Sequence, residues 1–162
     1  MEKLIENWKK YLKEEKQRVV TFDFDSTLSL SQWGEEEDEW VHDGPHHSFV
    51  KKIKKHKAAG DTVYIVTSRH EKYESSASEN PNQKAVQEFL DLYNISVDGI
   101  HFTNGQSKIE TLLKLNSSRH HDDDPEDIRD AKENGIEAVV SDPYGDYEKL
   151  KTSMEKMENE VE

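Results

Sequence analysis

Short apolar runs rich in β-branched residues alternate with helical patterns along this chain. The expected strands are 18–24, 63–67, 99–103, 117–121 and 136–140. The expected helices between them are 45–59, 81–93, 107–115 and 125–134. Strands that alternate with helices in this way favour a parallel sheet with helices on both faces. The sequence therefore predicts an α/β fold of three layers, in a single domain that spans residues 1–162.

The composition excludes several kinds of protein. The net charge of −13 disfavours non-specific binding to nucleic acid or to a membrane surface. The absence of cysteine excludes disulfides, thiolate catalysis and metal sites with sulfur ligands. We expect a cytoplasmic protein, because no apolar run is long enough to cross a bilayer and no signal segment follows Met1.

Three segments lie outside the alternating pattern. Residues 2–16 read as an additional N-terminal helix, and residues 146–162 as an acidic C-terminal helix. Residues 28–44 form an acidic, irregular segment that contains Trp33 and Trp40. This segment is either a flap over a binding site or a solvated loop whose two aromatic side chains pack on the body of the domain.

The strand at 18–24 ends in two carboxylates, Asp23 and Asp25. Side chains at positions i and i+2 of a strand point to the same face, so both carboxylates lean toward one point if the chain stays extended. Carboxylate oxygens suit Mg²⁺, and such a pair also offers a nucleophile beside a general acid and base. The alternative is a strand followed by an ordinary polar turn.

Polar residues also follow two other expected strands. Thr67, Ser68 and Arg69 close the strand at 63–67, and Asp122 and Asp123 follow the strand at 117–121. In open parallel sheets, ligands bind beyond the carboxyl ends of the strands. Three strand ends therefore bring oxygen ligands and phosphate-binding groups to the same edge of the sheet.

With these residues in order, the chain from Arg18 to Asp142 resembles the haloacid dehalogenase superfamily of phosphohydrolases, which has a Rossmann-like sheet. The first motif of that family, aspartate-x-aspartate-x-threonine, corresponds to residues 23–27. The hydroxyl residue that closes the next strand corresponds to Thr67, and the lysine before the acidic motif to Lys108. The acidic motif itself lies within 122–124.

The resemblance implies a role for each of these residues. Asp23 is expected to be the nucleophile that forms an aspartyl-phosphate, and Asp25 the acid and base that serves the leaving alcohol and then water. Thr67 and Lys108 are expected to hold the phosphoryl oxygens. The implied Mg²⁺ ligands are Asp23, the backbone carbonyl of Asp25, Asp123 and, directly or through water, Asp122.

Two parts of the acidic motif allow other interpretations. Asp127 is expected to support the metal ligands from outside, whereas Asp124 either joins them or caps the helix that begins at Pro125. The preceding strand is unusually polar because it contains His120 and His121. That strand is either short and hydrated, or its histidines serve the site; a zinc site is the less favoured alternative because no third histidine is in register.

The gaps at 29–44 and 104–107 are too short for the cap domain that many family members carry, so we expect a member without a cap. Within that class the chain is most similar to the 3′-phosphatase domain of polynucleotide kinase–phosphatases. In that likeness, Thr27, Ser68 and Arg69 bind substrate, and the planar guanidinium of Arg69 holds phosphate. The alternative for Arg69 is a surface ion pair.

We therefore predict a Mg²⁺-dependent phosphatase that hydrolyses phosphomonoesters of nucleotides or of nucleic-acid 3′ ends. The alternatives are a broad phosphatase of small molecules and a non-catalytic phosphate-binding module on the same fold. A phosphotransferase is disfavoured, because such enzymes usually need a cap to exclude water.

Overall fold

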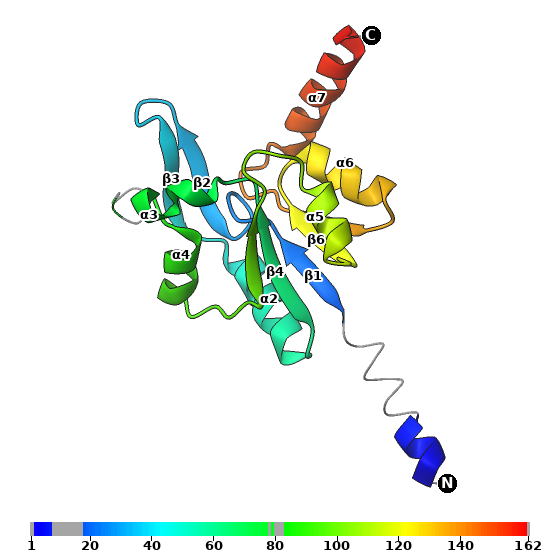
Figure 1. Ribbon diagram of the computed structural model, residues 1–162. Helices are drawn as coiled ribbons and strands as arrows, with labels where there is room; N and C mark the ends of the chain where they lie inside the picture. The colour runs from blue at the N-terminus through cyan, green and yellow to red at the C-terminus, as the bar shows by residue number, and fades with distance from the viewer. Residues whose placement is uncertain (1, 8–17, 78, 80–82, 162) are drawn as a thin grey trace.

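A computed structural model describes residues 2–7, 18–77, 79 and 83–161 of the chain (Figure 1). The strands are β1 (Val19–Phe22), β2 (Ser29–Gly34), β3 (Glu39–Pro45), β4 (Thr62–Thr67), β5 (Gly99–Phe102), β6 (Arg119–Asp122) and β7 (Glu137–Val140). The helices are α2 (His47–Ala58), α3 (Glu74–Ala77), α4 (Val86–Leu92), α5 (Ile109–Lys114), α6 (Pro125–Glu133) and α7 (Tyr147–Val161), with a 3₁₀ helix, η1 (Glu71–Tyr73).

Five strands form a parallel sheet in the order β5-β4-β1-β6-β7. The central strand is β1, in which Phe22 is in register with Ile65 of β4 and with His121 of β6. The carboxyl ends of β4, β1 and β6 therefore lie side by side. This arrangement confirms the predicted α/β fold with a parallel sheet.

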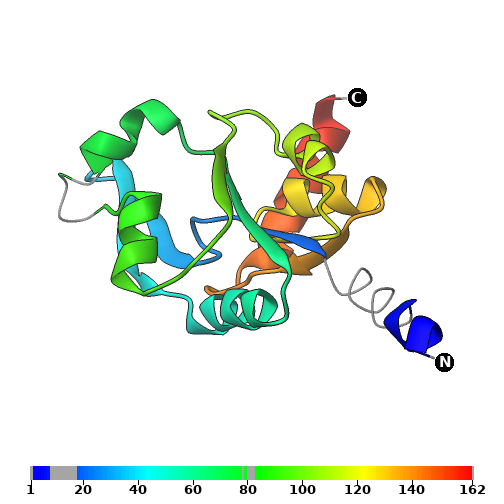
Figure 2. The same ribbon diagram turned by 60° about the horizontal axis from the view of Figure 1, so that its bottom comes forward.

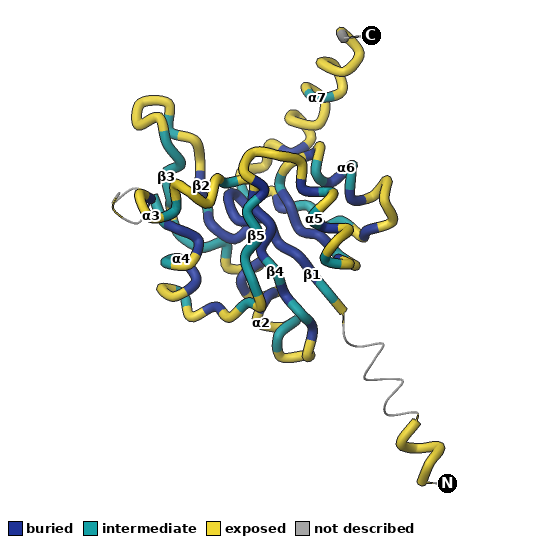
Figure 3. The backbone as a smooth tube through the Cα atoms, viewed as in Figure 1, coloured by how far each residue is buried: buried dark blue, intermediate teal, exposed yellow. Residues whose placement is uncertain are grey.

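Helices cover both faces of this sheet (Figure 2). On one face, Phe22 of β1 packs in a buried cluster with Ile53 of α2 and Phe89 of α4. On the other, Val66 of β4 packs with Leu112 of α5 and with α6. Because apolar side chains leave water on both faces, the buried strands form the interior of the molecule (Figure 3).

The acidic segment between β1 and α2 is an antiparallel hairpin of β2 and β3, so the prediction of irregular structure was wrong. Trp33 lies opposite Trp40, and the two rings meet edge to face with centroids 5.8 Å apart. Such cross-strand aromatic pairs stabilise strand pairing. The acidic residues are gathered in the turn, where Asp38 adopts a left-handed conformation that aspartate tolerates.

Several predicted boundaries differ from the structure. No element was predicted between the strand at 63–67 and the helix at 81–93, but η1 and α3 lie in this segment. The helix expected at 107–115 is α5, which begins only after Lys108 and has no side-chain cap. The strand expected at 117–121 is β6, which extends one residue further and so includes Asp122.

The two ends of the chain have helical segments. Residues 2–7 are helical and exposed, and the remainder of the predicted helix at 2–16 lies outside the described residues. At the other end, α7 begins at Tyr147 and projects from the sheet (Figure 1). No described helix combines the length and apolar character that a membrane span needs.

Candidate active site

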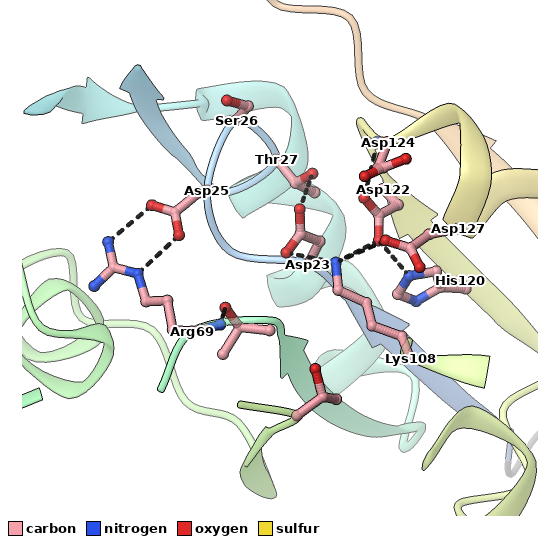
Figure 4. A network of polar contacts seen from close by, with 12 residues as sticks. Asp23, Asp25, Ser26, Thr27, Arg69, Lys108, His120, Asp122, Asp124 and Asp127 are labelled. Carbon is pink, nitrogen blue, oxygen red and sulfur yellow. Dashed lines mark hydrogen bonds and ion pairs between the residues drawn. The ribbon is translucent and has the colours of Figure 1, made fainter. Parts of the chain in front are cut away.

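Side chains from three adjacent strand ends lie close together at one edge of the sheet (Figure 4). Asp23 directly follows β1, Thr67 is the last residue of β4, and Asp122 is the last residue of β6. All three are buried. Lys108, the residue before α5, extends its side chain into the same place.

The ammonium group of Lys108 is surrounded by carboxylates. Its Nζ lies 2.9 Å from Asp23 Oδ1, 2.7 Å from Asp122 Oδ2 and 3.5 Å from Asp127 Oδ2. Lys108 is only 3% exposed, so these carboxylates replace the water that would otherwise solvate its charge. Burial alone would lower the pKa of Lys108, but Asp122, Asp23 and Asp127 outweigh burial and raise the pKa well above its ordinary value.

A buried histidine fixes Asp122 from the opposite side. His120 Nε2 lies 2.7 Å from Asp122 Oδ2, and His120 Nδ1 lies 2.8 Å from Thr21 Oγ1. Burial lowers the pKa of His120, so the ring is neutral, with Nε2 donating to the carboxylate and Nδ1 accepting from the hydroxyl. Burial alone would raise the pKa of Asp122, but Lys108 and His120 outweigh burial and hold it below its ordinary value.

These contacts explain why a polar strand is buried inside the sheet. His121 stacks on Phe22 with ring centroids 3.8 Å apart, and its Nδ1 lies 2.9 Å from the carbonyl oxygen of Thr21. His120, His121 and Asp122 of β6 are thus buried, and His120 is held against Asp122. The role of Thr21 was not predicted. The sequence feature that could have indicated this role is the i, i+2 spacing. It places Thr21 on the same face of its strand as Asp23, and His120 on the same face as Asp122.

The other carboxylates of the site hold protons more tightly than usual. Burial raises the pKa of Asp23 well above its ordinary value, and the charge of Asp122 adds to this effect. Burial also raises the pKa of Asp123 to about 7 and that of Asp127 to about 7. The single lysine therefore does not balance the negative charge of the cluster, which favours a further cation.

Asp23, Asp122 and Asp123 form a group that fits such a cation. One carboxylate oxygen from each lies within 4.8 Å of the others. Hard oxygen ligands and buried negative charge suit Mg²⁺, which keeps part of its coordination for water and phosphate. No histidine belongs to this group, and no other such group occurs in the described parts of the chain, so zinc is not favoured there.

Mg²⁺ is expected to stabilise the protein more at pH 8 than at pH 5. Burial raises the pKa of Asp123 to about 7, so the folded protein favours the protonated form of this side chain. The stability that the protonated Asp123 contributes is complete below about pH 4, and it is lost as the pH rises to about 7. Mg²⁺ binds the ionised carboxylates and restores stability at high pH. At about 100 times its Kd, it should raise the unfolding temperature at pH 8 by about 5–10 °C.

Thermal unfolding with MgCl₂ or with EDTA measures this difference. The variant Asp123→Asn should lose most of the stabilisation, whereas Asp124→Asn should keep it, because the Asp124 side chain caps α6 by accepting a hydrogen bond from the Glu126 amide. An equal Mg²⁺ effect at both pH values would contradict the assigned metal site.

Asp25 does not converge with Asp23. The strand ends at Phe22, and Ser26 has a left-handed backbone, so the alternation of a strand does not continue through this segment. The Asp25 carboxylate is bound at both oxygens by Arg69, with Nε 2.7 Å from Oδ2 and Nη2 2.8 Å from Oδ1 (Figure 4). Asp25 is therefore close to Asp23 in sequence but faces a different partner.

Arg69 forms a buried ion pair rather than the surface pair considered as an alternative. Its Nη1 donates to Glu74 Oε2 at 3.3 Å and to the Lys84 carbonyl oxygen at 2.7 Å, and the guanidinium lies over the ring of Phe24. Burial alone would lower the pKa of Arg69, but Asp25 and Glu74 outweigh burial and raise it. Most of the donors of Arg69 are therefore engaged within the protein.

The hydroxyl residues predicted to bind substrate occupy different positions. Thr27 Oγ1 is buried 3.5 Å from Asp23 Oδ2, at the long limit of a hydrogen bond. Thr67 Oγ1 accepts a hydrogen bond of 3.2 Å from the Arg69 amide. Ser68 lines a pocket beside Arg69. Thr27 thus borders Asp23, Thr67 contacts the backbone of Arg69 at the end of the neighbouring strand, and Ser68 lies toward the pocket.

Comparison of the sequence with protein-family models and with curated proteins gives no match. Solved structures do match. One chain in a structure of the Pnkp1/Rnl/Hen1 RNA repair complex is 18% identical, with a TM-score of 0.57 over 76% of this chain. A second structure of the Pnkp1/Rnl/Hen1 complex contains a chain that is 16% identical, with a TM-score of 0.56 over 77% of this chain. The chain has a haloacid dehalogenase-like fold.

This haloacid dehalogenase-like domain corresponds to less than half of the matched chains, 42% and 45% of their lengths. In the described residues, the connection from β1 to α2 holds only the β2–β3 hairpin, and the connection from β5 to α5 is a short loop. Neither contains a separate cap domain, as the sequence predicted. The strand-end site is therefore covered by no separate domain among the described residues, and its central side chains Asp23, Lys108 and Asp122 are buried.

Proposed function

We propose that this protein is a Mg²⁺-dependent phosphatase that hydrolyses phosphomonoesters through an aspartyl-phosphate on Asp23. The observation that carries the proposal is the cluster around Lys108, in which Nζ lies 2.9 Å from Asp23 Oδ1 and 2.7 Å from Asp122 Oδ2. A carboxylate nucleophile needs a nearby cation, since it must approach a negatively charged phosphoryl group. Lys108 is positioned to offset that repulsion.

Asp23, Asp122 and Asp123 would hold Mg²⁺, with the backbone carbonyl of Asp25 as a further proposed ligand. When bound, the ion would supply positive charge next to the phosphoryl oxygens. His120 and Lys108 keep Asp122 ionised and oriented, which a metal ligand requires. The residues of the site therefore fit the metal in both charge and ligand type.

In the first step, a carboxylate oxygen of Asp23 attacks phosphorus, and the bond from phosphorus to the substrate alcohol breaks. Asp25 donates a proton to the departing alkoxide. Lys108, Thr67 and Thr27 hold the phosphoryl oxygens during this transfer. Their work is positioning and neutralisation of charge, which is most of what phosphoryl transfer requires of a protein.

In the second step, Asp25 accepts a proton from water, and the resulting hydroxide attacks phosphorus. The bond from phosphorus to Asp23 breaks, releasing inorganic phosphate and restoring the carboxylate. Arg69 now binds both oxygens of Asp25, so proton transfer requires Asp25 to turn away from it. Once released from Asp25, Arg69 is free to bind substrate phosphate, the role proposed for it together with Ser68.

The proposed substrates are nucleotides and nucleic-acid 3′ ends. The fold shared with a chain of an RNA repair complex supports this class. The net charge of −13 disfavours a groove that follows a long nucleic-acid strand, because such grooves need a basic surface. A mononucleotide or a single terminal nucleotide fits this charge better than an extended strand.

Phosphate release from a panel of substrates, with MgCl₂ or with EDTA, tests the proposal. The panel contains 3′- and 5′-mononucleotides, a 3′-phosphorylated oligonucleotide, sugar phosphates and p-nitrophenyl phosphate. We expect release that needs Mg²⁺ and is fastest with 3′-phosphates. Folded protein that binds Mg²⁺ but releases no phosphate would instead support a phosphate-binding module, and equal rates on all substrates would support a broad phosphatase.

A further inference from the structure

A pocket of about 750 Å³ opens beside the candidate site, between the β2–β3 hairpin and the segment that follows β4. Trp33 and Trp40 line it from the hairpin, and Arg69, His70 and Tyr73 line it from the opposite wall. These two walls lie next to each other in the fold, with η1 and α3 beside the hairpin (Figure 1). The proposed reaction assigns no role to most of this pocket.

The pocket is unusually rich in aromatic rings that are not packed in the core. Trp33 is 51% exposed and Tyr73 is 58% exposed. Trp33 and Trp40 meet edge to face, and so do His70 and Tyr73, with ring centroids 5.8 Å apart in each pair. Each wall thus presents an aromatic pair to the pocket, and such rings stack well on a flat heterocycle.

The charge of the lining restricts what can occupy the pocket. The acidic residues Asp38, Glu39 and Glu74 lie in the lining, and Arg69 is the cation that the proposed reaction assigns to the phosphate being removed. The described lining contains no lysine and no further arginine for a second phosphate group, which is therefore disfavoured. An uncharged flat ring that carries N–H donors satisfies both the aromatic and the acidic parts of the lining, because carboxylates accept hydrogen bonds from the amino groups of bases.

The pocket lies next to the residues of the proposed reaction. Arg69 lines the pocket and binds Asp25, the proposed acid and base, so the pocket begins one side chain away from Asp25. We propose that this pocket binds the nucleobase of the nucleotide whose phosphate is removed, with Trp33 as a stacking partner. This inference rests on the proposed function and names the part of the substrate, besides phosphate, that the protein recognises.

The test compares adenosine 3′-monophosphate with glycerol 3-phosphate, which has no base. In Trp33→Ala, the ratio of kcat/KM for the nucleotide to that for glycerol 3-phosphate should fall by about tenfold, the effect of losing one base stack, mainly through KM. Trp33→Phe should retain most of the ratio because it keeps an aromatic ring. Leu113→Ala, on the exposed face of α5 and outside the pocket, should leave it unchanged.

A calorimetric titration with adenosine, which has no phosphate, separates this inference from the proposed function. Adenosine binding to the intact protein that is lost in Trp33→Ala supports the pocket even if no substrate releases phosphate. Phosphatase activity with an unchanged substrate ratio in Trp33→Ala would overturn the base pocket and leave the phosphatase proposal standing. Tighter binding of phosphocholine than of the nucleotide, dependent on Trp33, would also overturn it in favour of a cation pocket.

Discussion

Replacing Asp23 by asparagine is expected to reduce phosphate release by about a thousandfold or more, because the amide oxygen is a poor nucleophile toward phosphorus. The variant should still fold. Burial already raises the pKa of Asp23 and so favours its neutral form, and Lys108 keeps its contact of 2.7 Å with Asp122. The loss would therefore reflect chemistry rather than unfolding. Steady-state rates with 3′-mononucleotides and MgCl₂ measure it.

Asp124→Asn is the matched control for Asp23→Asn. Both variants remove one carboxylate near the same sheet edge, but Asp124 caps α6 and asparagine caps helices equally well. Its activity should remain close to that of the original protein. If Asp23→Asn kept substantial activity, Asp23 would not be the nucleophile.

Replacing Lys108 by methionine is expected to destabilise the metal-free protein at pH 8 by about 3–5 kcal/mol, the usual effect of leaving buried charge without its partner. Methionine has a similar length but no charge, so Asp23, Asp122 and Asp127 would face one another without a cation. Chemical unfolding in EDTA measures the free energy of unfolding.

Two conditions should partly rescue Lys108→Met. Lowering the pH from 8 to 5 protonates Asp127 and Asp123, whose pKa values burial raises to about 7. Adding Mg²⁺ supplies a cation directly. The matched control is Lys114→Met at the end of α5, the helix that Lys108 precedes; this lysine is exposed and pairs with Glu110, which is also exposed, so no measurable change is expected. Equal stability of Lys108→Met and the original protein in EDTA at pH 8 would exclude a charge cluster that depends on Lys108.

The sequence predicted the sheet edge well because the strand ends are local features. Asp23 and Thr67 follow or close β-branched runs, and Asp122 follows a polar segment whose place in the alternating pattern predicted a strand. The carboxyl ends of parallel strands lie at the same edge of a sheet, so these residues were expected to come together. Lys108 was predicted only through the family resemblance. Its three carboxylate contacts depend on the packing of α5 against the sheet, which no local pattern describes.

Other parts of the site could not be predicted, since they depend on tertiary contacts. The direction of Asp25 follows from the end of β1 at Phe22 and from the left-handed backbone of Ser26, neither of which alternation reveals. The burial of His120 depends on a hydroxyl from a neighbouring strand. The hairpin was missed because its acidic turn outweighed the β-forming Trp33 and Trp40 on either side.

The most direct test of the account is to look for the phosphoryl group on Asp23. The protein is mixed with a 3′-mononucleotide and MgCl₂, quenched in acid during turnover, and analysed by mass spectrometry of its peptides. We expect one phosphoryl group on the peptide that contains Asp23, absent when EDTA replaces MgCl₂. Phosphate release with no phosphorylated peptide at any quench time would contradict the account and indicate direct attack by water.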